Sequence, residues 1–231
     1  MNGADPAIRI SVPPDLDPVS GAAFLKRVRA ANDIEGRVIV LEGTDGVFCR
    51  GLDPKCIESS QSTDDLQVFA DALLALRRIS KVVIAAVDGS ALGGGLGLAA
   101  AADVVVATEE STFGLPEAQL GLAPAIIMPF LLERMRLQEC RLWSLSSYSR
   151  SAADAVKAGL VDVLTTRSEF PRQIQYWIRQ MTRAHPTSVL HVKRLTSAGG
   201  EHLESSVRDG LALTSELLKN AASFKPFQNH E

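Results

Sequence analysis

Two glycine-containing turns could hold negative charge on a carbonyl oxygen. They cover residues 48–53 (FCRGLD) and 88–97 (DGSALGGGLG), and each follows a β-branched run. Two converging backbone N–H groups, one at a turn and one at a helix N-terminus, suit that task. Glycine lets the backbone approach a ligand closely because no Cβ intervenes. The pattern therefore predicts an oxyanion site of the kind that chemistry at the α-carbon of an acyl thioester requires.

Other interpretations of these turns remain open on the residues alone. Gly93–Gly95 could equally serve close packing of a helix against a strand, and their GxGxxG-like spacing is a weak dinucleotide signal without an acidic residue ending a second strand. Cys49 could be a nucleophile, but no His stands in a recognisable partner motif, so a small buried hydrophobe is the stronger interpretation. Glu117 follows Pro116 and could be a helix-start carboxylate.

Composition excludes several classes of function. The 231 residues carry a formal net charge of −3 with 22% charged side chains, and Lys and Arg are dispersed, so nucleic-acid binding has little support. The apolar stretch 82–102 contains Asp88 and five glycines, which argues against a membrane span. We expect no signal peptide and no metal site. The three cysteines are odd in number and lack metal-ligand spacing, which favours reduced thiols in a cytoplasm.

The elements that would position the turns alternate along the first half of the chain. Strands are expected at 7–12, 37–42, 81–88 and 104–108, with helices at 20–31, 66–78 and 93–102. This order indicates an α/β fold with a mostly parallel sheet covered by helices. Beyond Pro124 helices are expected at 126–135, 138–146, 152–158, 170–185, 188–197 and 201–223, with a short strand at 161–164.

Four motifs, in the same order, resemble the crotonase (enoyl-CoA hydratase/isomerase) superfamily. They are residues 48–53, similar to F-C-A-G-x-D; 83–103, similar to P-V-I-A-A-V-x-G-x-A-x-G-G-G and a helix ending in C-D; 113–117 (FGLPE) with 121–124 (GLAP); and 151–155 (SAADA) with 159–162 (GLVD). The resemblance extends from about residue 8 to about residue 218. It implies a ββα spiral core over 1–190, a C-terminal helical segment over 191–231 that covers the active site or mediates assembly, and a homotrimer or hexamer.

The resemblance also assigns roles to residues. The oxyanion donors would be the backbone N–H groups of Arg50 and Gly94. Glu117 matches the second catalytic glutamate of the hydratases, whereas Gly97 stands where they carry the first. A single carboxylate in an apolar pocket should have a raised pKa, which suits a group that accepts and returns a proton. The implied substrate-binding positions around these groups are Cys49, Gly51, Asp53, Lys55, Gly93 and Gly97.

A narrower resemblance points to small crotonase homologues of polyketide β-branching cassettes. Residues 47–53, 87–89 and 121–131 (GLAPAIIMPFL) carry it. It implies dehydration of 3-hydroxy-3-methylglutaryl-ACP to 3-methylglutaconyl-ACP, with the substrate on a phosphopantetheine arm of ACP or CoA and no other cofactor. Alternatives are an isomerase, a decarboxylase or a noncatalytic subunit.

Two groups of cations are candidates for contacts with this substrate or its carrier. Arg50 and Lys55 flank the first turn and could meet the distal carboxylate of the acyl group. Arg77, Arg78 and Lys81 could dock an acidic ACP, although a charged, solvated helix end is the stronger interpretation.

Overall fold

The computed structural model describes residues 7–53, 63–196 and 200–221, and its main sheet is entirely parallel. Five strands lie in the order β1-β2-β4-β6-β9. Their bounds are Ala7–Ser11 (β1), Val38–Glu42 (β2), Val82–Val87 (β4), Val104–Thr108 (β6) and Val163–Thr165 (β9). The β2, β4 and β6 side chains are buried almost throughout, because helices cover both faces of the sheet. The expected parallel α/β architecture is confirmed.

A second sheet of short strands lies beside the first and was not expected from the sequence. Its order is β3(Val47–Cys49)-β5(Ser90–Leu92)-β7(Thr112–Gly114)-β8(Arg150–Ser151), and only the β7–β8 pair is antiparallel. Strands of two or three residues are too short to show a period of two in the sequence. Successive β2-β3, β4-β5 and β6-β7 pairs each give one strand to either sheet, which is the spiral that the resemblance implied.

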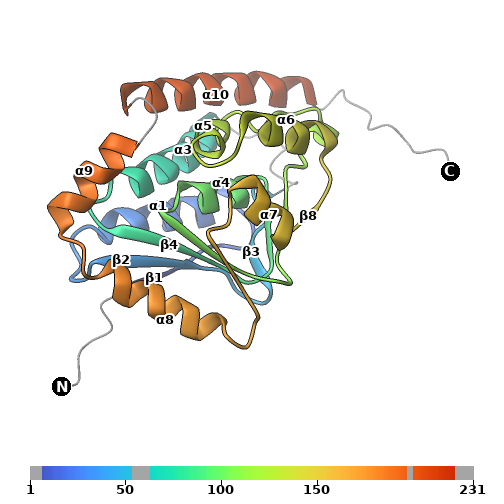
Figure 1. The fold of residues 1–231 in the computed structure, drawn as a ribbon. Coiled ribbons are helices and arrows are strands. Elements are labelled where there is room, and N and C mark those ends of the chain that lie inside the picture. The colour runs from blue at the N-terminus through green and yellow to red at the C-terminus, as the bar shows by residue number, and fades with distance from the viewer. Residues whose placement is uncertain (1–6, 54–62, 197–199, 222–231) are drawn as a thin grey trace.

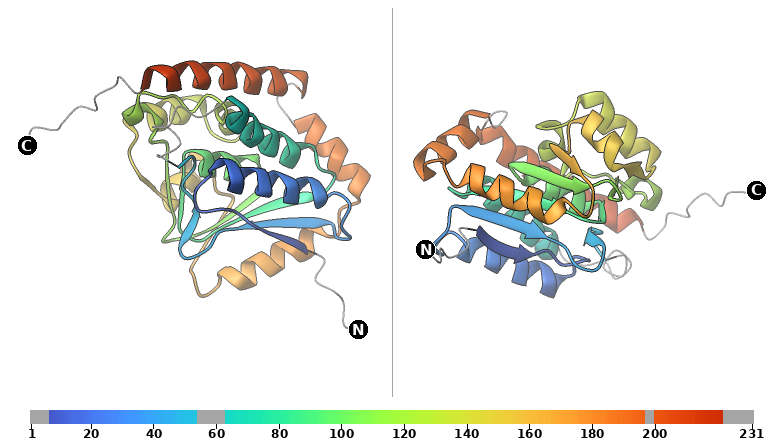
Figure 2. Two further views of the ribbon diagram at one scale, coloured as in Figure 1. Left: turned by 180° about the vertical axis from the view of Figure 1, so that it is seen from behind. Right: turned by 60° about the horizontal axis from the view of Figure 1, so that its bottom comes forward.

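Helices form layers on both faces of the main sheet (Figure 1). α1(Pro18–Ala30), α3(Thr63–Arg78) and α4(Gly94–Ala101) pack on one face within the larger apolar core. α8(Phe170–Met181) covers the opposite face, where Ile174 and Ile178 meet Val40 and Ile84 in a second core. Figure 2 shows from behind how α1 and α3 lie side by side above the sheet. The site is thus carried by elements that are anchored on a rigid, buried scaffold.

The remaining helices of the described residues all follow β7 in the chain. They are the 3₁₀ turn η1(Glu117–Leu120), α5(Met128–Leu132), α6(Leu137–Ser146), α7(Ala152–Ala158), α9(Pro186–Thr196) and α10(Gly200–Ala221). α5 is shorter than the helix expected over 126–135, because Ile127 is its N-cap residue and Glu133 its C-cap residue. α8 ends at Met181, before the expected 185.

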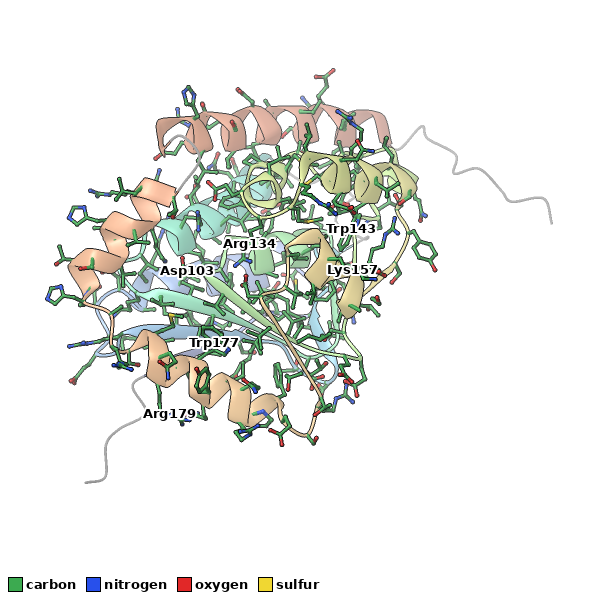
Figure 3. The ribbon with its side chains drawn as sticks, in the orientation of Figure 1. Asp103, Arg134, Trp143, Lys157, Trp177 and Arg179 are labelled. Atoms are coloured by element: carbon green, nitrogen blue, oxygen red, sulfur yellow. The ribbon has the colours of Figure 1, made fainter. Side chains whose placement is uncertain are left out.

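Arg134 fixes the end of α4 that lies away from the glycine turn. Its guanidinium, labelled in Figure 3 beside Asp103, donates to the carbonyl oxygens of Ala102 at 3.2 Å and Asp103 at 3.1 Å. It also forms an ion pair with Asp162 at 3.0 Å. Ala102 is the C-cap residue of α4 and Asp103 lies one residue beyond it, so these bonds tie the chain to Arg134 just where the helix ends. The direction of α4, and with it the position of its N-terminus, is therefore held from behind.

Two of the three candidate docking cations, Arg77 and Lys81, are engaged inside the protein. Lys81 is buried and donates to the carbonyl oxygens of Ile34 and Gly36. The Arg77 side chain is only 13% exposed and pairs with Glu133 at 2.6 Å, while Arg78 pairs with Glu204 of α10. These contacts join α3 to neighbouring elements, so Arg77 and Lys81 do not form an exposed docking surface for an acidic protein. The Arg78 side chain is 56% exposed, and docking through it stays a prediction.

Candidate active site

The two glycine turns are in direct backbone contact. A Cβ added to Gly51 would lie 2.7 Å from the Gly94 amide nitrogen, and one added to Gly95 would lie 2.0 Å from the Cys49 carbonyl oxygen. Gly51 also has φ +88°, a conformation that side-chain-bearing residues rarely adopt. Close approach of these backbones therefore requires glycine at both positions. The glycine cluster therefore does serve close backbone packing, and this packing brings the two turns together.

The amide of Arg50 is not free to bind a substrate oxygen. Its N–H donates to the Pro14 carbonyl oxygen at 2.7 Å, because the segment around residues 14–16 runs alongside the first turn. The same pairing uses the Asp53 N–H, which donates to the Leu16 carbonyl oxygen at 3.1 Å. The expectation that the Arg50 amide is an oxyanion donor is therefore wrong for this structure.

The Leu52 amide is the free donor of the first turn. The Gly51 N–H contacts Cys49 Sγ at 3.4 Å, so three of the four amides at positions 50–53 are engaged. Within the described part of the chain no acceptor is bonded to the Leu52 N–H, and Leu52 lines the cavity described below. Sequence reasoning missed this residue because pairing of a main-chain amide is not encoded in the type of its side chain.

The Gly94 amide, the other candidate donor, lies at the N-terminus of α4. Gly94 is the first helical residue after the N-cap Gly93, so its N–H has no partner inside the helix. The Gly93 N–H is tied to the Gly114 carbonyl oxygen at 2.9 Å, and this bond fixes the turn against β7. The helix dipole adds partial positive charge at this end.

The Glu117 side chain, at the start of η1, lies beside the second glycine turn. A Cβ on Gly93 would meet Glu117 Oε1 at 3.1 Å, which places the carboxyl group beside the second turn. Its Oε2 is buried and has no hydrogen-bond partner among the described residues. Burial raises the pKa of Glu117 to about 7. Such a carboxyl group can both take up and release a proton near neutral pH.

A small cavity joins these groups. It has a volume of about 80 Å³ and is mostly apolar. Its walls come from the first turn, α3, α4, η1, the segment before α5, and α10: Arg50, Leu52, Phe69, Gly93, Gly94, Pro116, Glu117, Leu120, Leu122, Ala123, Pro124, Ala125, Ile126, Ile127 and Thr214. Glu117, Gly93 and Gly94 are thus brought together as the sequence predicted.

The other predicted substrate-binding residues lie beneath or beside the cavity. Cys49 is fully buried, and burial raises the pKa of its thiol to about 12, so a thiolate nucleophile is strongly disfavoured. Gly51 supports the contact between the turns, and Asp53 pairs through its backbone with Leu16. Gly97 is buried on α4 behind Ile127. Lys55 lies outside the described residues.

The Arg50 side chain already has an anionic partner. Its Nε donates to Asp15 Oδ1 at 2.8 Å, and a second, short contact joins Nη2 to Asp15 Oδ2. The guanidinium nevertheless remains about half exposed and lines the mouth of the cavity. A half-exposed cation thus lines the cavity.

Two negative findings concern the described residues only. None of their helices is both long and apolar enough to cross a membrane. No group of three or more Cys, His, Asp and Glu side chains among them is arranged as a metal site.

Comparisons with known proteins identify a family and several relatives. Residues 23–229 match the family model described as enoyl-CoA hydratase/isomerase. The chain is 35% identical over 156 residues to mevalonyl-coenzyme A hydratase sidH of Aspergillus fumigatus, covering 66% of this chain and 58% of that protein. It is 29% identical over 166 residues to bacillaene synthase dehydratase PksH of Bacillus subtilis, covering 70% and 63%. The matches thus span about three fifths of the length of these two relatives.

A solved structure supports the same grouping. The crystal structure of an enoyl-CoA hydratase from Mycobacterium avium superimposes with a TM-score of 0.82 at 27% identity. The superposition covers 94% of this chain and 88% of that one.

Proposed function

Because the chain belongs to the enoyl-CoA hydratase/isomerase family, we propose that it is a lyase that dehydrates a β-hydroxyacyl thioester. The observation that carries this proposal is the single buried carboxyl group of Glu117, with a pKa raised to about 7, beside the Gly94 amide. The proposed substrate is 3-hydroxy-3-methylglutaryl on the phosphopantetheine of an ACP, with CoA as the other possible carrier. The relatives named as a hydratase and as a dehydratase support the type of reaction, and the acyl group is proposed from the narrower motif resemblance.

The proposed reaction uses the groups of the cavity in sequence. The N–H groups of Leu52 and Gly94 hold the thioester oxygen, and Glu117 as carboxylate takes the proton from C2. The resulting enolate is stabilised by the two amides. It expels the hydroxyl group from C3 as the C2=C3 double bond forms, and the proton on Glu117 passes to that leaving oxygen as water departs. Glu117 returns to the carboxylate, so the cycle is balanced without another acid.

The free carboxylate of a glutaryl chain would need a cation at the edge of the site. Arg50 lines the cavity and is half exposed, and Lys55 follows a few residues later in the sequence. We propose that the Arg50 side chain meets this carboxylate while it retains Asp15 as a partner. A planar guanidinium has five donors, which is enough for two carboxylates.

The test is incubation with 3-hydroxy-3-methylglutaryl-ACP and analysis of the acyl-carrier mass. Loss of water marks dehydration, and Glu117→Gln should lower the rate by about 10²–10⁴-fold because it removes the carboxyl group that carries the proton. Glu110→Gln, at an exposed carboxylate, is the matched control and should leave the rate unchanged.

Other outcomes separate the alternatives. Loss of carbon dioxide from 3-methylglutaconyl-ACP would indicate a decarboxylase, and migration of a double bond at constant mass would indicate an isomerase. Pathway activity that survives Glu117→Gln unchanged would indicate a noncatalytic subunit. Any of these results would replace the dehydratase proposal.

A further inference from the structure

Ile127 occupies the space that any side chain at position 97 would need. A Cβ added to Gly97 would lie 2.3 Å from Ile127 Cγ2 and 2.8 Å from Ile127 Cβ. Rotation about χ1 of Ile127 cannot remove the contact with its Cβ, so relief requires movement of the backbone. Ile127 is 3% exposed and lines the cavity, which means that it forms the wall facing Gly97.

The segment that carries Ile127 is held from the opposite side as well. A Cβ on Gly210 of α10 would lie 2.4 Å from the Ala125 carbonyl oxygen and 2.9 Å from the Ile126 nitrogen. The Met128 N–H donates to the Pro124 carbonyl oxygen at 2.9 Å, and this bond closes the turn. The segment is therefore clamped between α4 and α10, and Ile127 cannot withdraw from Gly97 without displacing one of these helices.

We propose that Ile127 is a specificity-determining residue that keeps this cavity a single-carboxylate site. The proposal rests on the proposed function, because Glu117 is taken as the sole proton carrier. A side chain at 97 would leave α4 toward the wall that Ile127 forms, where a second carboxylate could hold a water molecule against C3. Ile127 fills that volume with a branched apolar side chain instead. Glu117 then serves both C2 and the oxygen at C3, in dehydration and in the reverse addition of water, and no carboxylate at position 97 shares this work.

The chemistry of the two arrangements differs in one step. Addition of water requires a base to remove a proton from water as its oxygen bonds to C3, while C2 receives a proton from an acid. With Ile127 in place, Glu117 alone must both take the proton from water and deliver a proton to C2. Removing the apolar wall and adding a carboxylate at 97 would supply the missing base.

A four-variant cycle tests this inference. It compares wild type, Gly97→Glu, Ile127→Ala and the double variant for thermal stability and for hydration of crotonyl-pantetheine, followed by loss of the enoyl thioester absorbance. Gly97→Glu alone should lower the Tm by roughly 4–10 °C because it overpacks a buried contact. Adding Ile127→Ala should recover at least about half of that loss, and the double variant should hydrate at least about tenfold faster than wild type.

Gly97→Glu combined with Ile126→Ala is the matched control. Ile126 is also buried and lines the cavity, but it is not among the atoms nearest to a Cβ at 97. This change should not restore the Tm. Equal recovery by the two alanine variants, a Gly97→Glu protein as stable as wild type, or a stable double variant without faster hydration would each overturn the proposal. The Tm coupling is measured without a substrate, so failure of the wild type to dehydrate its proposed substrate would count against the proposed function alone.

Discussion

At the scale of single residues, burial gives Glu117 its chemical character. Its carboxyl group has no hydrogen-bond partner at Oε2 among the described residues, and apolar side chains such as Leu122 and Ile127 share its cavity. Burial without a partner penalises the charged form, which raises the pKa to about 7. Burial without a partner raises the free energy of the carboxylate form, and for the same reason it lets Glu117 accept and release a proton at neutral pH.

We predict a pH dependence that follows ionisation of Glu117. The carboxylate is the form that takes the proton from C2, so kcat/KM in the free enzyme should rise with pH and level off above about 7. An ordinary glutamate would give a plateau already above about pH 5.5. The measurement is a rate profile between about pH 5 and pH 9 with a substrate analogue. A profile that is flat between pH 5 and 7 would contradict the prediction.

The same group should make stability depend on pH. The folded pKa lies above the unfolded one, so between about pH 4.5 and 7 the folded protein binds a proton that the unfolded chain has released. The free energy of unfolding should therefore fall as pH rises through this window, by up to about 3 kcal/mol relative to Glu117→Gln. Urea unfolding of both proteins at about pH 5 and pH 8 measures the difference.

The amide of Leu52 offers a second test at this scale. Its N–H makes no hydrogen bond within the described part of the protein, so Leu52→Pro should remove the oxyanion donor without breaking a native bond. Loss of one such donor typically costs about 10²–10³ in kcat. Leu52→Ala keeps the N–H and should lose less than about tenfold. Similar rates for the proline and alanine variants, with both folded by circular dichroism, would exclude the Leu52 amide.

At the scale of elements, α4 is the part that aligns the site. Arg134 binds the carbonyl oxygens of the C-cap residue Ala102 and of Asp103 just beyond it, and the N-terminal glycines of α4 contact the first turn. The helix is buried on all sides, so its sequence has no polar face from which its orientation could be predicted. Its position is therefore determined by close packing and by Arg134 together.

Two glycine-to-alanine changes should have opposite effects on the free energy of unfolding. Gly95→Ala places a Cβ 2.0 Å from the Cys49 carbonyl oxygen and should destabilise the protein by more than about 2 kcal/mol. Gly21 lies within α1, where the nearest atom to a Cβ is Val68 Cγ1 at 3.9 Å. Gly21→Ala should therefore stabilise the protein by about 0.5–1 kcal/mol. Urea unfolding compares both variants with wild type, and equal signs would refute the packing argument.

At the scale of the whole molecule, apolar side chains gather on one outer surface. Leu137, Leu142, Leu145 and Tyr148 on and after α6 are between 46% and 74% exposed. Such a group of large apolar side chains is typical of a surface that another protein covers. We expect a second copy of this chain to cover it.

Light scattering should therefore give a mass three times, or six times, that of the 24.7 kDa chain. Leu145→Lys should shift the mass toward that of the single chain, because it places a charge on the apolar surface. Val19→Lys, at an exposed position on α1, is the control and should leave the mass unchanged. A wild-type mass of 24.7 kDa would refute the prediction of a homotrimer or hexamer.

The sequence by itself determined the layout of the protein and the types of its reacting groups. Continuous β-branched runs at β2, β4 and β6 predict buried parallel strands, and helical periodicity locates α1, α3 and α7. The order of motifs identifies Glu117 and Gly94, because a carboxylate and a helix-start glycine are visible as residue types.

Only the tertiary structure decided which amide of the first turn is free and what stands opposite Gly97. The Arg50 amide is bonded to Pro14, about 36 positions earlier in the chain, and Ile127 reaches Gly97 across 30 positions. Both contacts depend on how distant segments pack, and a main-chain hydrogen bond or a filled volume has no signature in local residue type. The raised pKa of Glu117 has the same origin, since apolar side chains around it, such as Leu52, Phe69 and Ile127, come from segments far apart in the chain.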